Sequence, residues 1–330
     1  MLLDSGKAIF SRRKNYMPSK TFVKFPVIDK HNNFETFVPV GIVEGQNPGP
    51  TLAVIGAVHA TEYAAHDGVA RFWESLDPTE LSGKVYVVLA ADVMALCSHT
   101  QYTNPIDGKN LNRVWPGKAD GTLTEVIAYT ITQEVISHAD YVVDSHGGEF
   151  DEAIDLFIIT HQAGQPDLDQ KTLDFALALG FPFVEVTDAH GTVLGSGTGA
   201  AEAVKSGRPA VTLEAGGRGL REERHISAVY NSLQNALKFL GIKPGQPVPW
   251  AGQSIKLDHG VILKTTQLGL YQPAVTVGDW IEKDAVFARV LDFDGRLLEE
   301  IRVPEAGVVL DVISARGIKA NAFAGKIGVV

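Results

Sequence analysis

The chain has 330 residues, of which 45% are hydrophobic and 21% charged, which suits a folded protein with one large domain and a small one. Its formal net charge of -10 at pH 7 argues against nucleic-acid or anionic-membrane partners, and no stretch approaches the roughly 20 apolar residues of a membrane span. Cys97 is the only cysteine, which excludes an intrachain disulfide, argues against a thiolate metal site and fits a cytoplasmic location.

The first part of the chain alternates predicted strands and helices. The predicted strands are 21–28, 36–43, a run ending at Val58, 84–90, and 141–146. Helices are predicted over about 63–76 and 122–137. Between them, residues 99–121 form a long loop rich in Asn, Pro, Asp and Gly, and loops of this length are usually functional.

The alternation continues after residue 146. Further strands are predicted over 154–160, 183–187 and 209–214, and further helices over 167–179, 199–205 and 222–240. This order of elements predicts an α/β fold with a mixed, largely parallel sheet and helices on both faces.

The composition changes at residues 244–249, which contain three prolines. Beyond them only short strands are predicted, over 260–264, 285–291, 297–303 and 307–313. We therefore predict a large domain over 1–245 and a small all-β domain over 246–330.

His59 and Glu62 stand three positions apart where the third strand gives way to a helix. The carboxyl ends of strands are where α/β sheets bind ligands, and side chains at i and i+3 share a face. An imidazole and a carboxylate can hold one Zn²⁺, and His146, which ends another strand, is the candidate third ligand. A fourth position would stay open for water, so the pattern predicts a mononuclear zinc hydrolase domain over 1–245. Asp144 is either a partner of His146 or a buried, hydrogen-bonded carboxylate.

Two further sites carry groups that suit hydrolysis. Glu214 ends a buried strand just before two glycines, which suits a general acid/base, although it is alternatively a structural glutamate bonded to backbone amides. In the long loop, Asn112 and Arg113 can together bind a carboxylate. We therefore expect a small anionic substrate.

Four segments together resemble the succinylglutamate desuccinylase/aspartoacylase family, in order and approximate spacing: His59-Ala60-Thr61-Glu62, Asn110-Leu111-Asn112-Arg113, the strand ending at His146, and Thr212-Leu213-Glu214. The resemblance covers roughly 36–240 and implies a zinc carboxypeptidase-like fold. It also implies that His59, Glu62 and His146 bind one Zn²⁺ per chain, that Asn112 and Arg113 bind the substrate carboxylate, and that Glu214 is the acid/base. The implied activity is hydrolysis of an N-acyl amino acid to an amino acid and a carboxylate.

Two positions depart from the family pattern. Ala60 stands where members usually have glycine, and would be strained if its φ were positive. Tyr102 stands where members with the longer loop commonly carry an arginine that stabilises the oxyanion. The Tyr102 hydroxyl would donate instead, as a substrate-binding group, or an arginine would reach in from 218, 221 or 224.

The C-terminal domain resembles the barrel-sandwich fold of biotinyl and lipoyl carriers, notably around 277–279 and 303–308. A carrier needs a lysine on its central hairpin, and the corresponding segment Asp292-Phe293-Asp294-Gly295 has none. We therefore expect this domain to be structural or to shape the active site.

The leading hypothesis is a zinc-dependent amidohydrolase, a deacylase acting on C–N bonds other than peptide bonds. One alternative is a carboxypeptidase or esterase with the same metal centre. Another is a noncatalytic protein that holds the metal for structure or ligand sensing. The acyl group, the amino acid and a homo-oligomeric state are left open by the sequence.

Overall fold

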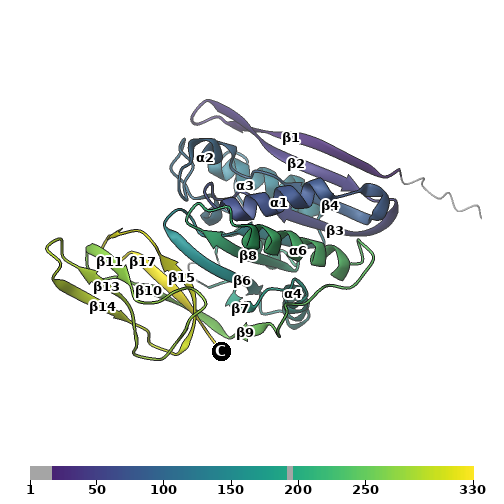
Figure 1. Cartoon of the computed structure of the whole chain (residues 1–330). Helices are drawn as coiled ribbons and strands as arrows, with labels where there is room; N and C mark the ends of the chain where they lie inside the picture. Colours follow the sequence, from purple (N-terminus) through teal and green to yellow (C-terminus); the bar gives the residue numbers. More distant parts are fainter. Residues whose placement is uncertain (1–16, 192–195) are drawn as a thin grey trace, which may run out of the picture.

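A mixed β-sheet runs through the molecule and joins strands from both sides of the proline-containing segment (Figure 1). The computed structural model describes residues 17–191 and 196–330. The strand order is β1-β2-β4-β3-β5-β8-β6-β15-β17-β10, with β7, β9 and β12 off this path. The strands before residue 245 are β1 (Ser19–Asp29), β2 (Phe34–Glu44), β3 (Asn47–Ile55), β4 (Ser82–Val88), β5 (Tyr141–His146), β6 (Glu152–Gln162), β7 (Phe183–Asp188) and β8 (Ala210–Gly217).

The centre of this sheet is parallel. Strand β3 pairs in parallel with β4 and β5, and β5 pairs in parallel with β8. Their carboxyl ends therefore meet at one edge, where the β5–β8 register places His146 opposite Glu214. Strand β6 pairs antiparallel with β8 on the side of β8 that faces away from β5.

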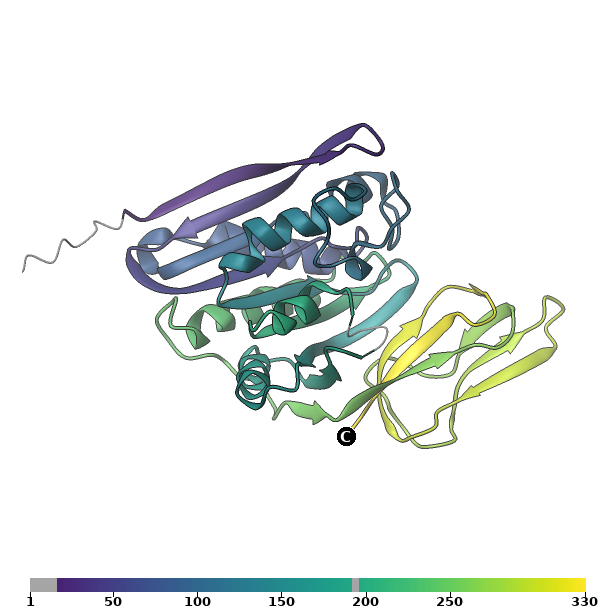
Figure 2. The same cartoon turned by 180° about the vertical axis from the view of Figure 1, so that it is seen from behind.

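Helices cover both faces of the sheet, which confirms the predicted α/β class (Figures 1 and 2). Residues of α1 and α6 pack into one apolar cluster and those of α3 and α5 into another on the opposite face, and α4 contributes residues to both. The helices are α1 (Tyr63–Ser75), α2 (Val93–Ser98), α3 (Leu123–Glu134), α4 (Pro166–Ala178), α5 (Gly199–Lys205) and α6 (Glu223–Phe239), with 3-10 turns η1 (Pro78–Glu80), η2 (Leu111–Arg113) and η3 (Ile136–His138). None of the helices in the described part of the chain has the length and apolar character needed to cross a membrane.

The C-terminal region is all β, as predicted, and is largely antiparallel. Its strands are β9 (Ile255–Leu257), β10 (His259–Lys264), β11 (Gly269–Pro273), β12 (Trp280–Ile281), β13 (Val286–Leu291), β14 (Leu297–Arg302), β15 (Gly307–Ile313), β16 (Gly317–Ile318) and β17 (Phe323–Val329). Four of them form a separate sheet, β14-β13-β11-β16, whereas β15 pairs with β6 of the main sheet. The C-terminal region therefore lies against the edge of the sheet next to β6, while the domain boundary at 245/246 stays a prediction.

Three elements near the parallel edge differ from the sequence expectation, and one of them is β8, which runs past Glu214 to Gly217. The third strand ends at Ile55 instead of Val58, because Ala57 has a φ of 55° and turns the chain out of the sheet. The short helix α2 was not predicted, and its first turn is capped by the Asp92 carboxylate, which accepts from the N–H of Ala95 at 2.9 Å.

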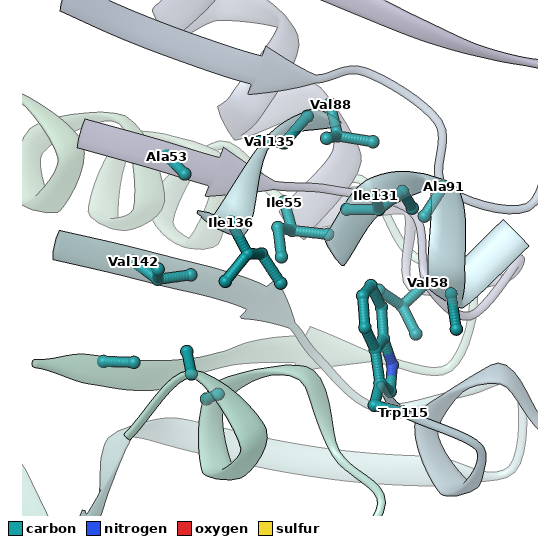
Figure 3. Packing of buried hydrophobic residues seen from close by; sticks show 14 of the residues in the cluster. Ala53, Ile55, Val58, Val88, Ala91, Trp115, Ile131, Val135, Ile136 and Val142 are labelled. Carbon is teal, nitrogen blue, oxygen red and sulfur yellow. The ribbon is translucent and has the colours of Figure 1, made fainter. Parts of the chain in front are cut away.

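The loop that carries Asn112 and Arg113 is anchored in the apolar core. Trp115 lies two positions after the end of η2 and is only 4% exposed. Figure 3 shows its ring beside Val58, the residue that precedes His59. Because a buried tryptophan contributes a large apolar area, this contact holds the loop against the end of β3.

Candidate metal centre

Three side chains from two strand ends converge at the parallel edge. His59, Glu62 and His146 each offer one ligand atom, and these atoms lie within 4.8 Å of one another. The Glu62 carboxylate lies between the two imidazoles, with Oε1 2.7 Å from Nδ1 of His59 and Oε2 3.1 Å from Nδ1 of His146. All three side chains are buried.

The outer nitrogen of each imidazole faces an oxygen. Nε2 of His59 lies 3.1 Å from Oδ1 of Asn110, and Nε2 of His146 lies 3.2 Å from Oδ1 of Asp144. The Asn110 acceptor favours the tautomer of His59 that is protonated at Nε2, which leaves the Nδ1 lone pair of His59 directed at the centre. Both imidazoles direct Nδ1 at the Glu62 carboxylate, an orientation that suits metal ligands.

The electrostatics of the centre favour a cation. Burial raises the pKa of Glu62, but His146 and His59 outweigh it and bring that pKa to about 2. Oε2 of Glu62 is buried and has no hydrogen-bond partner among the described residues. Two imidazole nitrogens and one carboxylate oxygen are a donor set that zinc prefers, and a bound ion would satisfy the orphaned oxygen. These residues fit a zinc ion.

The centre opens into a cavity of about 420 Å³, which is lined by every residue that the sequence predicted for the site. These residues are His59, Glu62, Tyr102, Asn112, Arg113, His146 and Glu214. Burial raises the pKa of Glu214 well above its usual range, although His146 opposes this effect. The carboxylate of Glu214 therefore takes up a proton more readily than that of an exposed glutamate, as an acid/base group in the wall of the cavity requires.

The loop with Asn112 and Arg113 is tied directly to the metal centre. Oδ1 of Asn110 accepts from the N–H of Asn112 at 2.8 Å and faces Nε2 of His59. The buried Oδ1 of Asn112 has no hydrogen-bond partner among residues 17–191 and 196–330. Arg113 lines the same cavity, so an amide and a guanidinium face it together.

Tyr102 occupies the position at which family members with the longer loop commonly carry an arginine. Its backbone is left-handed, with a φ of 55°, and its N–H donates to Oε1 of Glu149 at 3.0 Å. Its ring centroid is 5.6 Å from that of His59. Burial, the charge of the neighbouring Glu152 carboxylate and a hydrogen bond to that carboxylate raise the pKa of Tyr102, so the hydroxyl keeps its proton.

The arginines that were left open as alternatives lie elsewhere. Arg221 pairs with Asp67 at 2.6 Å, and neither it nor Arg218 or Arg224 lines the cavity formed by the described residues. The glycine-to-alanine departure is also harmless to the backbone, because Ala60 is not among the residues with positive φ.

Sequence reasoning missed part of the cavity wall. Glu152 follows His146 after a short turn, and Asp311 lies in β15 within the apolar run Val308–Ile313. A lone carboxylate inside an apolar strand is a signal that could have marked Asp311, since burying a charge is costly. The remaining C-terminal residues of the wall are Ile262, Ile313, Ala322, Phe323 and Lys326.

Comparison with known proteins agrees with this arrangement. Residues 48–240 match the Succinylglutamate desuccinylase/Aspartoacylase catalytic domain. The chain is 27% identical over 296 residues to the N-alpha-acetyl-L-2,4-diaminobutyric acid deacetylase of Halomonas elongata, covering 87% of this chain and 84% of that protein. Among solved structures, the product-bound ectoine utilization protein EutE (DoeB) of Ruegeria pomeroyi superimposes with a TM-score of 0.84 at 24% identity, covering 96% of this chain and 100% of that one. A succinylglutamate desuccinylase/aspartoacylase from Rhodobacter sphaeroides superimposes with a TM-score of 0.83 at 21% identity, covering 94% and 95%.

Proposed function

The chain belongs to the succinylglutamate desuccinylase/aspartoacylase family, and on this premise we propose that it hydrolyses the amide bond of a small N-acyl amino acid at a single zinc ion. The observation that carries the proposal is one cavity in which the His59–Glu62–His146 cluster and Glu214 face each other. The deacetylase of Halomonas elongata, which acts on an N-acetylated amino acid, supports this substrate class.

In this proposal His59, Glu62 and His146 hold the zinc through two Nδ1 atoms and one carboxylate. The ion, when bound, supplies a Lewis acid that lowers the pKa of a coordinated water to about 7. Asn110 and Asp144 keep the two imidazoles oriented from behind.

Glu214 moves the proton. Its carboxylate accepts one proton from the attacking water and returns it to the nitrogen of the leaving amine, so that the C–N bond breaks to a neutral amine and a carboxylic acid, which then releases the second proton of the water to solvent and becomes a carboxylate. Its position opposite His146 in the β5–β8 register places it beside the centre without occupying a ligand position.

The loop side of the cavity binds and polarises the substrate. Arg113 and Asn112 bind the α-carboxylate of the amino acid, because a guanidinium and an amide together offer several donors to one anion. The Tyr102 hydroxyl donates to the carbonyl oxygen as this oxygen gains negative charge.

The test combines metal content with activity. We expect about one zinc per chain in protein purified without chelators. We also expect hydrolysis of N-acetyl or N-succinyl amino acids that is lost with a chelator and restored by zinc. The variant Glu214→Gln should retain the metal and lose turnover by roughly 10²- to 10⁴-fold. The exposed Glu134→Gln serves as the matched control and should behave as the unmodified protein.

Two results would overturn the proposal. Protein that binds no zinc lacks the centre on which the reaction depends. Activity on peptides or simple esters only, with none on N-acyl amino acids, would favour the carboxypeptidase or esterase alternative.

A further inference from the structure

We propose that Glu149 is a positioning residue that acts through Tyr102: its side chain fixes the backbone of Tyr102, so that the phenol lies in the cavity wall within reach of the substrate's carbonyl oxygen. This inference rests on the proposed function, because it concerns the group that polarises the substrate there. It starts from a buried carboxyl group that the hydrolytic mechanism does not use.

The backbone of Tyr102 needs support from outside its own loop. Its φ of 55° lies in the left-handed region, which is unfavourable for a residue with a Cβ atom. The next residue bonds locally, since the N–H of Thr103 donates to the carbonyl oxygen of Gln101 at 2.6 Å. The N–H of Tyr102 instead donates to Oε1 of Glu149, 47 positions away, at 3.0 Å. This long-range hydrogen bond stabilises the left-handed conformation.

The side chain of Glu149 is costly for the fold to bury. Glu149 is fully buried, and its Oε2 has no hydrogen-bond partner within the described part of the chain. A buried carboxyl group that leaves one oxygen without a partner contributes little to the stability of a fold. The residue type at this position therefore points to a role other than stability.

The turn that carries Glu149 is held by backbone hydrogen bonds. The carbonyl oxygen of Glu149 accepts from the N–H of Arg218 at 2.8 Å, and the N–H of Ser314 donates to the carbonyl oxygen of Asp151 at 2.7 Å. These contacts fix the turn to β8 and to the C-terminal region without the Glu149 side chain. The side chain is thus left to act on the loop of Tyr102.

The phenol of Tyr102 is attached to the same turn. Its hydroxyl hydrogen-bonds to the carboxylate of Glu152, and Oε2 of Glu152 accepts from the N–H of Glu149 at 3.2 Å. Tyr102 is thus held at its backbone and at its hydroxyl by residues 149–152, which follow His146 after two glycines. A rotation about the Cζ–Oη bond then turns the proton from Glu152 to the substrate, with no movement of the ring.

The carboxylate-binding part of the same loop is anchored elsewhere. Between it and Tyr102, the amide of Asn104 donates to both carboxylate oxygens of Asp92 at 2.9 Å. On its other side, Trp115 is buried in the apolar core. Loss of the support of Tyr102 should therefore leave Arg113 in place, which predicts an effect on kcat with little effect on KM.

A double-mutant cycle with Tyr102→Phe measures whether Glu149 acts through Tyr102. In the parent protein, Glu149→Leu should lower kcat for an N-acetyl amino acid by roughly 10- to 100-fold, because it displaces a donor whose removal costs roughly 10²- to 10³-fold. KM should change by less than about 3-fold, and zinc content should stay the same. In Tyr102→Phe the same substitution should lower kcat by less than about 3-fold, since no hydroxyl is left to position.

Two further variants separate this role from general support of the loop. Glu149→Gln keeps an oxygen that accepts from the N–H of Tyr102 and should retain kcat to within about 3-fold. Gln101→Leu is the matched control, because it removes an adjacent contact between the same segments, from Nε2 of Gln101 to Oδ1 of Asp151 at 2.9 Å. It should also leave kcat within about 3-fold of the parent value. Glu149→Ala replaces Glu149→Leu if that variant does not fold.

Tyrosine ionisation reads the position of Tyr102 without turnover. Burial and the contact with Glu152 hold the pKa of Tyr102 above its ordinary value. In Glu149→Leu the released phenol should become accessible to water and ionise nearer the ordinary pKa of about 10. Difference absorbance between about pH 8 and pH 11 should then show an additional tyrosinate, which disappears when Tyr102→Phe is combined with Glu149→Leu.

The outcomes separate this inference from the proposed function. Unchanged kcat in Glu149→Leu, the same loss in both backgrounds, or the same loss in Gln101→Leu overturns the positioning role and leaves the deacylase in place. A loss that appears only in KM, or a Glu149→Gln variant as impaired as Glu149→Leu, overturns it as well. If no N-acyl amino acid is hydrolysed, the proposed function fails and the absorbance decides. An additional tyrosinate in Glu149→Leu then supports the positioning of Tyr102, and an unchanged titration overturns it.

Discussion

Replacing Asp144 by asparagine tests whether the carboxylate behind His146 strengthens metal binding. Asp144 is fully buried, and its Oδ1 lies 3.2 Å from Nε2 of His146. Two unit charges at this distance attract by about 5 kcal/mol at an effective dielectric constant of about 20. A metal-bound imidazole is neutral with a polarised N–H, so the real effect is smaller. We expect zinc affinity to fall roughly 10- to 100-fold, which is about 1.4–2.7 kcal/mol.

The assay is competition for zinc against a chelator of known affinity, with thermal unfolding of the metal-free protein measured alongside. The matched control is Asp140→Asn, an exposed aspartate just before β5 that accepts from the N–H of Thr51 at 2.8 Å. A folded Asp144→Asn variant with the zinc affinity of the control would refute the reasoning. In that case His146 is oriented by packing alone.

Three further predictions concern the oxyanion donor, a helix cap and a close backbone approach. Tyr102→Phe should lower kcat by roughly 10²- to 10³-fold with zinc content unchanged, because one hydrogen bond to the developing charge is lost. Glu125→Gln should cost about 1 kcal/mol of unfolding free energy at pH 7, because Glu125 completes the capping box of α3. Lysine contacts and the backbone lower the pKa of Glu125 to about 2, below its unfolded value, so this contribution is present above about pH 4.5 and shrinks as the pH falls toward 2. Gly217→Ala should destabilise by more than about 2 kcal/mol in urea unfolding, because the new Cβ would lie 2.1 Å from the carbonyl oxygen of Glu152.

Each of these predictions has a result that contradicts it. Unchanged kcat in Tyr102→Phe means that another group stabilises the oxyanion. A stability difference between Glu125→Gln and the unmodified protein that stays constant down to pH 3 would show that charge is not the cause. Gly317 is the control for Gly217, because a Cβ added at Gly317 would meet no heavy atom within 4 Å beyond its chain neighbours. Equal effects of alanine at both glycines would exclude the steric explanation.

Much of the fold follows from patterns that are local in the sequence. The alternation of apolar strands and amphipathic helices predicted the α/β class, because each pattern depends on the period of one element. The spacing of His59 and Glu62 is local in the same sense, because two residues three positions apart at the start of a helix direct their side chains to the same face. The strand end at His146 followed from the same patterns, whereas β8 runs past the predicted end at Glu214 to Gly217. Parallel pairing nevertheless brings His146 and Glu214 opposite each other.

Other features depend on contacts between segments far apart in the chain. The end of β3 at Ile55 follows from the turn at Ala57, which no hydrophobic period marks. The Asn110 side chain faces His59 across 51 positions because the buried Trp115 holds the loop in place.

The part of the cavity wall that the C-terminal region supplies is the clearest case of this division. Asp311 reaches the cavity because β15 pairs with β6, more than 150 residues earlier in the chain. The sequence shows which residue types are available for a site, and it predicts the local geometry within one turn or one strand. Pairing between distant strands depends on the free energy of burying apolar faces that several segments build together. A short stretch of sequence therefore cannot show which strands will pair. The sequence by itself thus determined the zinc chemistry that we propose, whereas tertiary packing decided which C-terminal side chains face the substrate.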